Sequence, residues 1–212
     1  MEDYTVNSKD IVYKLGEIAT KYCREASINP ATKDFVNVFI YPQYGIKGTS
    51  SSFEKAQAIL DFVQRYFRVN YERDAFFAEQ INHPVELMQR YIDYYIKGNQ
   101  MRIPIGDCDD LATLYCALVE SVGIRSVFVF PAYRPHGASS NSKKPNHIAC
   151  AVGIQDFGQD EPLWYIADPT SQLPLMRKDD YEKKVGQIIY VLPKRYVEPD
   201  GTKFLVIPRK WA

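Results

Sequence analysis

The sequence predicts an α+β fold in which helices pack on an antiparallel β-sheet. Two observations predict it: segments with apolar residues at helical spacing come first along the chain, and short apolar runs typical of strands follow them. The chain has 212 residues, of which 46% are hydrophobic, and this is enough to bury a substantial core. The predicted helices cover residues 9–24, 53–67, 84–98 and 107–122, and the predicted strands cover residues 126–132, 147–154, 163–167, 187–192 and 203–207.

The first fifty or so residues are predicted to form an extension ahead of the main domain. Ser8 is the expected N-cap of the first helix. Residues 34–41, which are rich in Phe and Val, are predicted to form a strand that Pro42 ends. Residues 45–52 are rich in Gly and Ser, so they are the best candidate for a domain boundary. The division that follows is an N-terminal extension with a linker (1–52), a core (53–175), and C-terminal strands that complete or extend the sheet (176–212).

The remaining helices have clear start and stop signals. Pro84 suits the first turn of its helix, and Gly98 is placed to end it. After Gly106 the helical spacing of apolar residues is the most regular in the chain, and Gly123 is placed to end this helix. Residues 133–146 are polar and carry Pro, Gly, Ser and Lys, which predicts an exposed, mobile loop.

Composition excludes several classes of function. The 26 Lys and Arg residues balance the 26 Asp and Glu residues, so no basic field favours nucleic acid. The longest apolar runs are too short to span a bilayer, and the N-terminus lacks the basic start and apolar stretch of a signal peptide. The four cysteines form no CxxC pair, which argues against a disulfide scaffold and a zinc ribbon. We therefore expect a cytoplasmic protein that binds no membrane, nucleic acid, metal ion or organic cofactor.

One cysteine stands where a helix is expected to begin. Cys108 precedes the most regular helix, where the helix dipole and unpaired backbone N–H groups favour the thiolate, the nucleophilic form of cysteine. Three neighbouring residues oppose a thiolate by their charge and are also candidates for capping the helix: Asp107, Asp109 and Asp110. The motif alone therefore leaves both a nucleophile and a buried structural cysteine open. The structural interpretation is the expected one for the other three cysteines: Cys23, Cys116 and Cys150.

Only three histidines are available, and His147 is predicted to begin one strand while Asp168 closes the next. The residue numbers of facing partners in an antiparallel pair have a constant sum, so a hairpin that pairs Val152 with Leu163 also places the histidine opposite the aspartate. Their backbones would then lie about 5 Å apart. A shift by two residues would still leave them diagonal neighbours. In contrast, His147 and Cys150 face opposite sides of the strand and are not expected to share a metal ion.

A thiol, an imidazole and a carboxylate are the groups that nucleophilic attack on a carbonyl needs. The thiolate attacks an amide or ester carbon, and the imidazole takes the thiol proton and later gives it to the leaving amine. The carboxylate holds the imidazole in the useful tautomer and stabilises its charged form. An ion pair between Cys108 and His147 would activate the thiol at neutral pH.

Residues 53–170 resemble a transglutaminase-like domain of the papain-type superfamily. Three blocks carry the resemblance in the expected order and spacing: a Gly-x-Cys-x-Asp-x-Ala helix start at residues 106–112, a strand that His147 begins, and the segment Trp-Tyr-Ile-Ala-Asp-Pro-Thr at residues 164–170. The helix at residues 56–63 and the strand after it also resemble those of the family. The Gly-Asp-Cys-Asp-Asp form is similar to compact bacterial and phage-encoded members.

The resemblance implies Cys108 as nucleophile, His147 as base and Asp168 as orienting acid. The activity it implies is acyl transfer on the amide bonds of a protein or peptide substrate: peptide hydrolysis, deamidation or cross-linking. We expect a peptidase or amidase rather than a cross-linking enzyme, because no acyl-acceptor site is recognisable. Transfer from a coenzyme A ester would use the same residues but has no recognisable nucleotide pocket. The alternative is a catalytically silent module with a structural or binding role among assembly partners, for instance in a phage particle.

The residues that would stabilise an oxyanion are predicted less directly. The backbone N–H of Cys108 or Asp109 is the expected donor, and Gln100 and Tyr66 are the side-chain candidates. Family members commonly have a Trp upstream of the cysteine, whereas both tryptophans here lie downstream of it. They also often have an aromatic residue two positions after the histidine, where this chain has Ala149.

Overall fold

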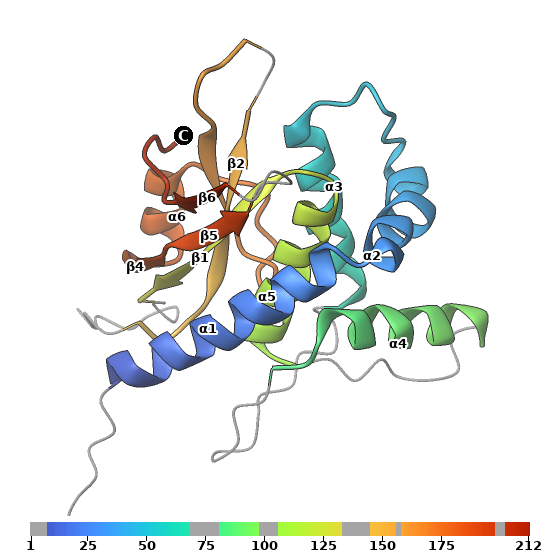
Figure 1. Cartoon of the computed structure of the whole chain (residues 1–212), viewed down its shortest axis with the longest axis horizontal. Helices are drawn as coiled ribbons and strands as arrows, with labels where there is room; N and C mark the ends of the chain where they lie inside the picture. Colours follow the sequence, from blue (N-terminus) through green and yellow to red (C-terminus); the bar gives the residue numbers. More distant parts are fainter. Residues whose placement is uncertain (1–7, 68–80, 98–105, 133–144, 156–157, 198–201) are drawn as a thin grey trace, which may run out of the picture.

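The computed structural model describes residues 8–67, 81–97, 106–132, 145–155, 158–197 and 202–212. Its helices are α1 (Ser8–Ser27), α2 (Pro30–Phe35), α3 (Ser52–Tyr66), α4 (Pro84–Ile96), α5 (Cys108–Ser121) and α6 (Lys178–Lys184), with a π-helical segment η1 (Val36–Ile40) and a 3-10 turn η2 (Tyr41–Tyr44). Its strands are β1 (Arg125–Pro131), β2 (Ala149–Ile154), β3 (Leu163–Ala167), β4 (Ile188–Leu192), β5 (Lys194–Val197) and β6 (Lys203–Val206). Helices and an antiparallel sheet therefore form the α+β arrangement that the sequence predicts (Figure 1).

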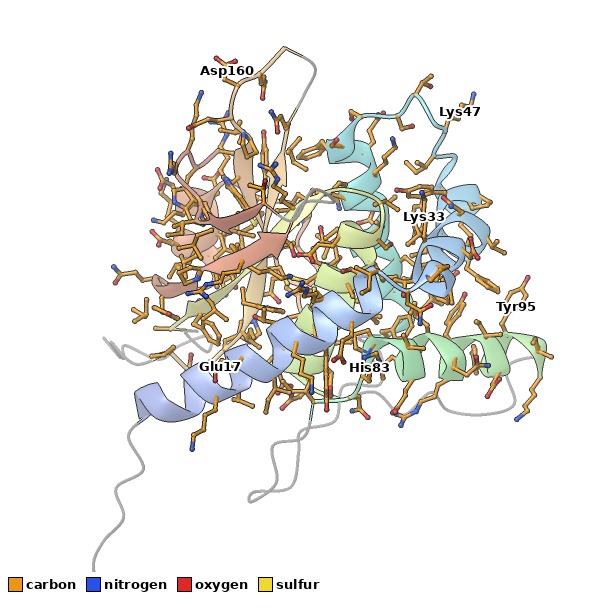
Figure 2. All side chains as sticks on the ribbon, in the orientation of Figure 1. Glu17, Lys33, Lys47, His83, Tyr95 and Asp160 are labelled. Carbon is orange, nitrogen blue, oxygen red and sulfur yellow. The ribbon has the colours of Figure 1, made fainter. Side chains whose placement is uncertain are left out.

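The main sheet has the strand order β3-β2-β1-β4 and is covered on both faces. Successive residues of a strand point to opposite faces, so Phe128 joins the larger core with α1 to α5, while its neighbour Val127 joins a smaller core. The smaller core includes Tyr181 of α6. Side chains fill the space between the sheet and the helices, and charged residues such as Lys47 and Asp160 lie at the periphery (Figure 2).

The predicted helices are confirmed as α1, α3, α4 and α5, with ends within a few residues of the expected ones. A capping box starts α3: Ser51 Oγ accepts a hydrogen bond from the Glu54 N–H at 3.2 Å, and the Ser51 N–H donates to Glu54 Oε2 at 2.7 Å. Pro84 lies in the first turn of α4, as predicted. Gly123 follows α5 with a φ of 85°, a conformation that glycine adopts readily. None of the helices in the described ranges has the length and apolar character needed to cross a membrane.

The predicted strand at residues 34–41 is wrong, because these residues continue the helical path of α2 through η1 into η2. Asn29 caps α2 by accepting a hydrogen bond from the Ala31 N–H at 3.0 Å, and Pro30 occupies the first turn. The buried residues of this segment pack in the larger core: Phe35, Val36 and Ile40. Burial therefore overrides the β propensity of Phe and Val here. The Asn-Pro pair is the sequence signal for this helix start.

The five predicted strands are confirmed as β1, β2, β3, β4 and β6, but the C-terminal part contains more helices and strands than expected. The sequence did not predict α6 or β5. The last strand, β6, pairs with β5 in a separate hairpin, and β4 is the strand that extends the main sheet beside β1. Because β2 begins at Ala149, His147 precedes the strand instead of opening it. Gly98 and residues 133–144 of the predicted loop lie outside the described residues.

The predicted register between β2 and β3 is wrong by two residues. Ile154, and not Val152, faces Leu163. The physical reason lies at Gly153, which pairs with Trp164: a Cβ on this glycine would lie 3.1 Å from the indole, so the ring packs closely over its backbone. The histidine and the aspartate of the candidate site are therefore offset along the hairpin and not directly opposite.

A buried ion pair joins segments from both ends of the chain. The Lys194 ammonium of β5 forms a salt bridge with the Glu120 carboxylate of α5, and the two side chains are 3% and 7% exposed. The ammonium also donates to Cys23 Sγ of α1 at 2.9 Å, and Ser126 Oγ of β1 donates to Glu120 Oε1 at 2.6 Å. Residues of the predicted extension, core and C-terminal strands thus meet in one buried cluster.

We expect Lys194→Met to lower the free energy of unfolding by about 3–5 kcal/mol, because it leaves the Glu120 carboxylate buried without its cation. Urea unfolding followed by circular dichroism measures this change. The matched control is Lys178→Met, which removes a partly exposed pair with Glu182 at 2.9 Å on α6. Its expected cost is about 0.5 kcal/mol or less. Equal losses in the two variants would contradict a stabilising role for the buried pair.

Candidate active site

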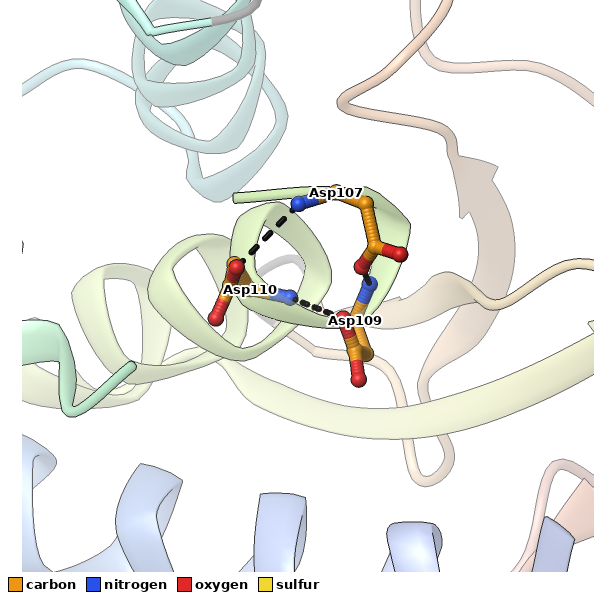
Figure 3. A group of neighbouring side chains, drawn as sticks. All are labelled: Asp107, Asp109 and Asp110. Atoms are coloured by element: carbon orange, nitrogen blue, oxygen red, sulfur yellow. Dashed lines mark hydrogen bonds between the residues drawn. The ribbon is translucent and has the colours of Figure 1, made fainter. Parts of the chain in front are cut away.

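Cys108 is the first residue of α5, at the helix start that the sequence predicts. Asp107 is the N-cap, and its Oδ1 accepts a hydrogen bond from the Asp109 N–H at 3.3 Å (Figure 3). In return, the Asp107 N–H donates to Asp110 Oδ2 at 3.1 Å. This reciprocal capping pairs backbone donors that the helix itself leaves free. It also places the cysteine at the positive end of the helix dipole.

Gly106 and Asn82 hold the cap in place. A Cβ at Gly106 would lie 1.1 Å from Asp110 Oδ2, so any larger residue would displace the capping carboxylate. Asn82, just before α4, donates from its backbone N–H to Asp110 Oδ1 and from its side-chain amide to Oδ2 at 3.1 Å. Asp110 is completely buried. No sequence signal marks the role of Asn82, because its partner lies 28 residues away along the chain.

His147 and Asp168 lie next to each other although neither belongs to a strand. His147 precedes β2, and Asp168 directly follows β3. The distance between His147 Nε2 and Asp168 Oδ2 is 3.1 Å, and the two side chains are 11% and 2% exposed. His147 also forms a side-chain hydrogen bond with Cys108. The three residues that the sequence singles out therefore form one contiguous group.

The His147 ring interacts with both Asp168 and Cys108. Its Nε2 contacts Asp168 Oδ2 at 3.1 Å and the Thr170 hydroxyl at 3.4 Å, and the Cys108 side chain also interacts with the ring. Burial by itself lowers the pKa of His147, but the Asp168 carboxylate and the Cys108 side chain outweigh burial and raise this pKa to about 10. The ring is therefore an imidazolium at neutral pH, which places a positive charge beside the Cys108 side chain.

The Asp168 carboxylate is held by further donors that the sequence did not predict. Oδ1 accepts hydrogen bonds from the Thr170 N–H at 3.1 Å and from the Thr170 hydroxyl at 2.7 Å. Oδ2, which contacts His147, also accepts one from the Tyr181 hydroxyl at 2.9 Å. Burial raises the pKa of Asp168, but the charge of His147 and these hydrogen bonds lower it below its ordinary value. The Gln64 amide of α3 donates to the Asp168 backbone carbonyl at 3.1 Å and so ties this turn to the helical layer.

The aspartates beside Cys108 do not all carry a charge. Asp109 is 6% exposed, and its Oδ1 accepts a hydrogen bond from the Asp110 N–H at 2.9 Å. Burial, together with the contact to Asp107, holds the pKa of Asp109 far above its ordinary value, so this carboxyl stays protonated at neutral pH. The negative charge that opposes a thiolate is thereby reduced. Carboxylate oxygens of the three aspartates lie within 4.8 Å of one another, and their shared capping of α5 accounts for this proximity.

Two of the predicted oxyanion donors already have hydrogen-bond partners in the structure. The Asp109 N–H already donates to the N-cap side chain. The Tyr66 hydroxyl donates to Gln43 Oε1 at 2.8 Å. Gln100 lies outside the described residues. The backbone N–H of Cys108 therefore stays as the predicted donor.

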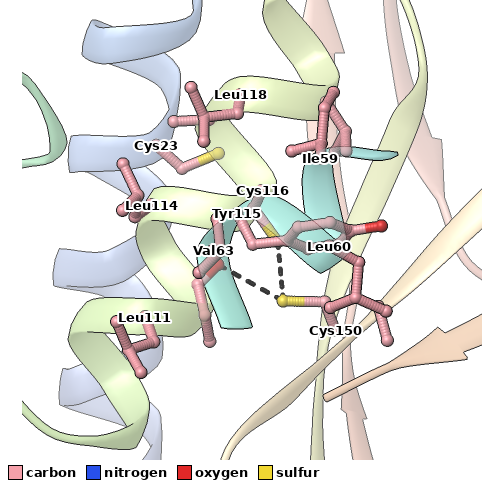
Figure 4. Close-up of a cluster of buried hydrophobic side chains, with 14 of the residues drawn as sticks. Cys23, Ile59, Leu60, Val63, Leu111, Leu114, Tyr115, Cys116, Leu118 and Cys150 are labelled. Carbon is pink, nitrogen blue, oxygen red and sulfur yellow. Dashed lines mark hydrogen bonds between the residues drawn. The ribbon is translucent and has the colours of Figure 1, made fainter. Parts of the chain in front are cut away.

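The other three cysteines are buried in the larger core (Figure 4). The Sγ atoms of Cys116 and Cys150 are 3.1 Å apart, and Cys150 Sγ also donates to the Ala112 carbonyl at 3.3 Å. Burial raises the pKa of all three thiols, which keeps them protonated and unreactive: Cys23, Cys116 and Cys150. Cys108, in contrast, is partly exposed.

Comparisons with known proteins match more than half of the chain to one family. The model of the Transglutaminase-like superfamily matches residues 41–169. Among solved structures, the chain is similar to a candidate cysteine protease from Cytophaga hutchinsonii (17% identity, TM-score 0.39, 82% of this chain and 49% of that chain). It is also similar to red sea bream transglutaminase (13% identity, TM-score 0.44, 88% of this chain and 34% of that chain). The chain thus spans half or less of the length of these structures. A comparison with curated proteins found no match.

We expect the His147 ring to stay protonated until about pH 10. Nitrogen-15 NMR of the ring, recorded as a function of pH, measures the midpoint. In Asp168→Asn the midpoint should fall, because the charge that raises the pKa most is gone. Since folding raises this pKa above 6.5, the histidine stabilises the fold fully below pH 6.5 and loses that effect as the pH rises through about 10. A midpoint near 6.5 in the unaltered protein would contradict the buried ion pair.

Proposed function

Because the chain belongs to the transglutaminase-like superfamily, we propose that it is a thiol enzyme that acts on amide bonds through Cys108, His147 and Asp168. This membership confirms the family resemblance and the fold that the sequence predicts. The observation that carries the proposal is the position of the histidine, whose Nε2 lies 3.1 Å from Asp168 Oδ2 and whose ring is hydrogen-bonded to Cys108. A nucleophile, a base beside it and a third group that orients the base are the elements of covalent acyl transfer.

In the proposed reaction, the Cys108 thiolate attacks the amide carbon, and the carbonyl electrons move to oxygen to give a tetrahedral intermediate. The His147 imidazolium then donates its Nδ1 proton to the leaving nitrogen as the C–N bond breaks, and a thioester remains on the cysteine. In the second half, the neutral imidazole takes a proton from water as the water oxygen attacks the thioester. The acid is released, and the thiolate and imidazolium are restored. Asp168 holds Nε2–H throughout.

We propose hydrolysis of a peptide or isopeptide bond, with a protein or peptide as the substrate. Water needs no binding site of its own, whereas transfer to an amine needs a site that holds the acceptor. The capped start of α5 supplies the fixed nucleophile that either reaction requires. Both reactions pass through the same thioester, so the acceptor alone decides between them.

A catalytically silent binding module is the second candidate, and exposed apolar side chains favour it. The residues Val38, Tyr95 and Ile96 are 63%, 61% and 75% exposed. Their elements are neighbours, because the rings of Phe39 in η1 and Tyr95 in α4 have centroids 5.7 Å apart. Clustered apolar surface is typical of contact with a protein partner.

We expect iodoacetamide to alkylate Cys108 at least about tenfold faster than the other cysteines at pH 6, because the imidazolium keeps its thiolate populated. Peptide mapping by mass spectrometry gives the rate at each site, and the three buried cysteines serve as internal controls. In His147→Ala the rate at Cys108 itself should fall on the order of tenfold, while the three other cysteines stay slow because they are buried. Equal Cys108 rates in the parent and in His147→Ala would contradict an activated thiol.

A second experiment on the parent protein distinguishes the proposed enzyme from the binding module. A peptide mixture is incubated with the parent and with Cys108→Ala, and mass spectrometry counts new peptide termini while a coupled assay follows ammonia. New termini that Cys108→Ala does not produce support hydrolysis, and ammonia without new termini supports deamidation. A peptide mass increase that requires an added amine supports transfer. If the parent and Cys108→Ala are indistinguishable on every readout, the binding module is the better description.

A further inference from the structure

We propose that Tyr181 is a positioning residue of this site, whose phenol fixes the carboxylate that orients His147. The inference rests on the proposed function, since it concerns how the same nucleophile, base and acid are held. Tyr181 lies on α6, beyond residues 41–169 that the family model matches. Its contribution comes from a segment that neither the family match nor the sequence pattern assigns to the site.

The hydrogen bonds around Asp168 leave its carboxylate no freedom to turn. The Tyr181 hydroxyl donates to Oδ2 at 2.9 Å, and His147 Nε2 contacts the same oxygen at 3.1 Å. Thr170 holds Oδ1 through its hydroxyl at 2.7 Å and its N–H at 3.1 Å. Each oxygen thus has two partners, which is the usual capacity of a carboxylate oxygen. Rotation about the Cβ–Cγ bond would break contacts on both sides.

Packing fixes the phenol independently of this hydrogen bond. Tyr181 is 1% exposed and lies in the smaller core with Trp164 and Ile166 of β3. The segment that leads into α6 is tied to the same strand, because Ile166 and Met176 exchange backbone hydrogen bonds at 2.8 and 2.9 Å. The helix that carries the phenol is therefore anchored to the strand whose end carries Asp168. A donor held by its surroundings can orient its acceptor.

The two cores of the protein meet at this carboxylate. Cys108 packs against the larger core, which contains α5, and Tyr181 belongs to the smaller core on the other face of the sheet. Asp168 is 3% exposed and contacts His147 on one side and the phenol on the other. The position of the imidazole relative to the thiol thus depends on packing in both layers. The phenol supplies this link without adding a charge to the site.

Tyr181→Phe keeps the ring and removes only the hydroxyl. We expect it to slow the alkylation of Cys108 by iodoacetamide at pH 7 on the order of tenfold, as for loss of a hydrogen bond to a charged group. The matched control is Tyr115→Phe, which removes another buried hydroxyl, one that donates to the Ala56 carbonyl at 3.2 Å. Tyr115 lies on the same helix as Cys108, yet removal of the Tyr115 hydroxyl should leave the alkylation rate of Cys108 unchanged. Near-UV circular dichroism establishes that each variant is folded.

A double-mutant cycle separates positioning from general packing. In Asp168→Ala the phenol has lost its acceptor, so Tyr181→Phe should change the Cys108 rate by less than about twofold in that background. The proposal is overturned if Tyr181→Phe slows alkylation equally in both backgrounds, if Tyr115→Phe slows it as much, or if Tyr181→Phe leaves it unchanged. A large effect that Asp168→Ala abolishes supports it.

Failure of the proposed function would be visible separately. If alkylation of Cys108 in the parent does not depend on His147, the thiol is not activated and the proposed enzyme is rejected. Tyr181 can then be tested on the histidine itself, by nitrogen-15 NMR of the ring. The proposal predicts a shift of the Nε2 signal in Tyr181→Phe and none in Tyr115→Phe. An unchanged Nε2 signal in Tyr181→Phe overturns it.

Discussion

The groups of the candidate site are placed relative to the first turn of α5, and reciprocal capping by two aspartates fixes that turn. Asp107 Oδ1 accepts the Asp109 N–H and Asp110 Oδ2 accepts the Asp107 N–H, so α5 begins at Cys108, directly after the N-cap. The close approach of Asp110 to the backbone requires glycine at position 106. Moving Cys108 by one position would separate it from this cap and turn it away from His147, because each helical residue rotates the side chain by about 100°.

The charges at the site centre on one cation, the His147 imidazolium. The His147 imidazolium lies between Asp168 and Cys108, where a second ionised carboxylate would compete for it. Protonation of Asp109 removes one such competitor. Asp168 can remain ionised while buried because it accepts four hydrogen bonds, and buried charge is tolerated only with such partners. The acidic character of the motif is thus compatible with a thiolate.

Periodicity predicted α3, α4 and α5 because each buries a continuous apolar stripe, and it placed Cys108 at a helix start. Residue propensity failed at residues 34–41, where a Phe- and Val-rich composition predicted a strand but burial decides the conformation. Periodicity missed α6, whose seven residues bury only Tyr181 and therefore show no apolar stripe. The hydrogen bond of Tyr181 with Asp168 joins two elements, and spacing along the chain carries no information about such a contact.

The buried cluster around Lys194 has a consequence for how the chain folds. Its contact with Cys23 joins residues that are 171 positions apart. Closing so long a loop loses chain entropy before any contact compensates it, so we expect this cluster to form late, after the local helices and hairpins. Until the cluster forms, the thiol of Cys23 would be open to solvent and to oxidants. Refolding yield should therefore depend on reducing conditions, although the completed fold shields this thiol from the same reagents.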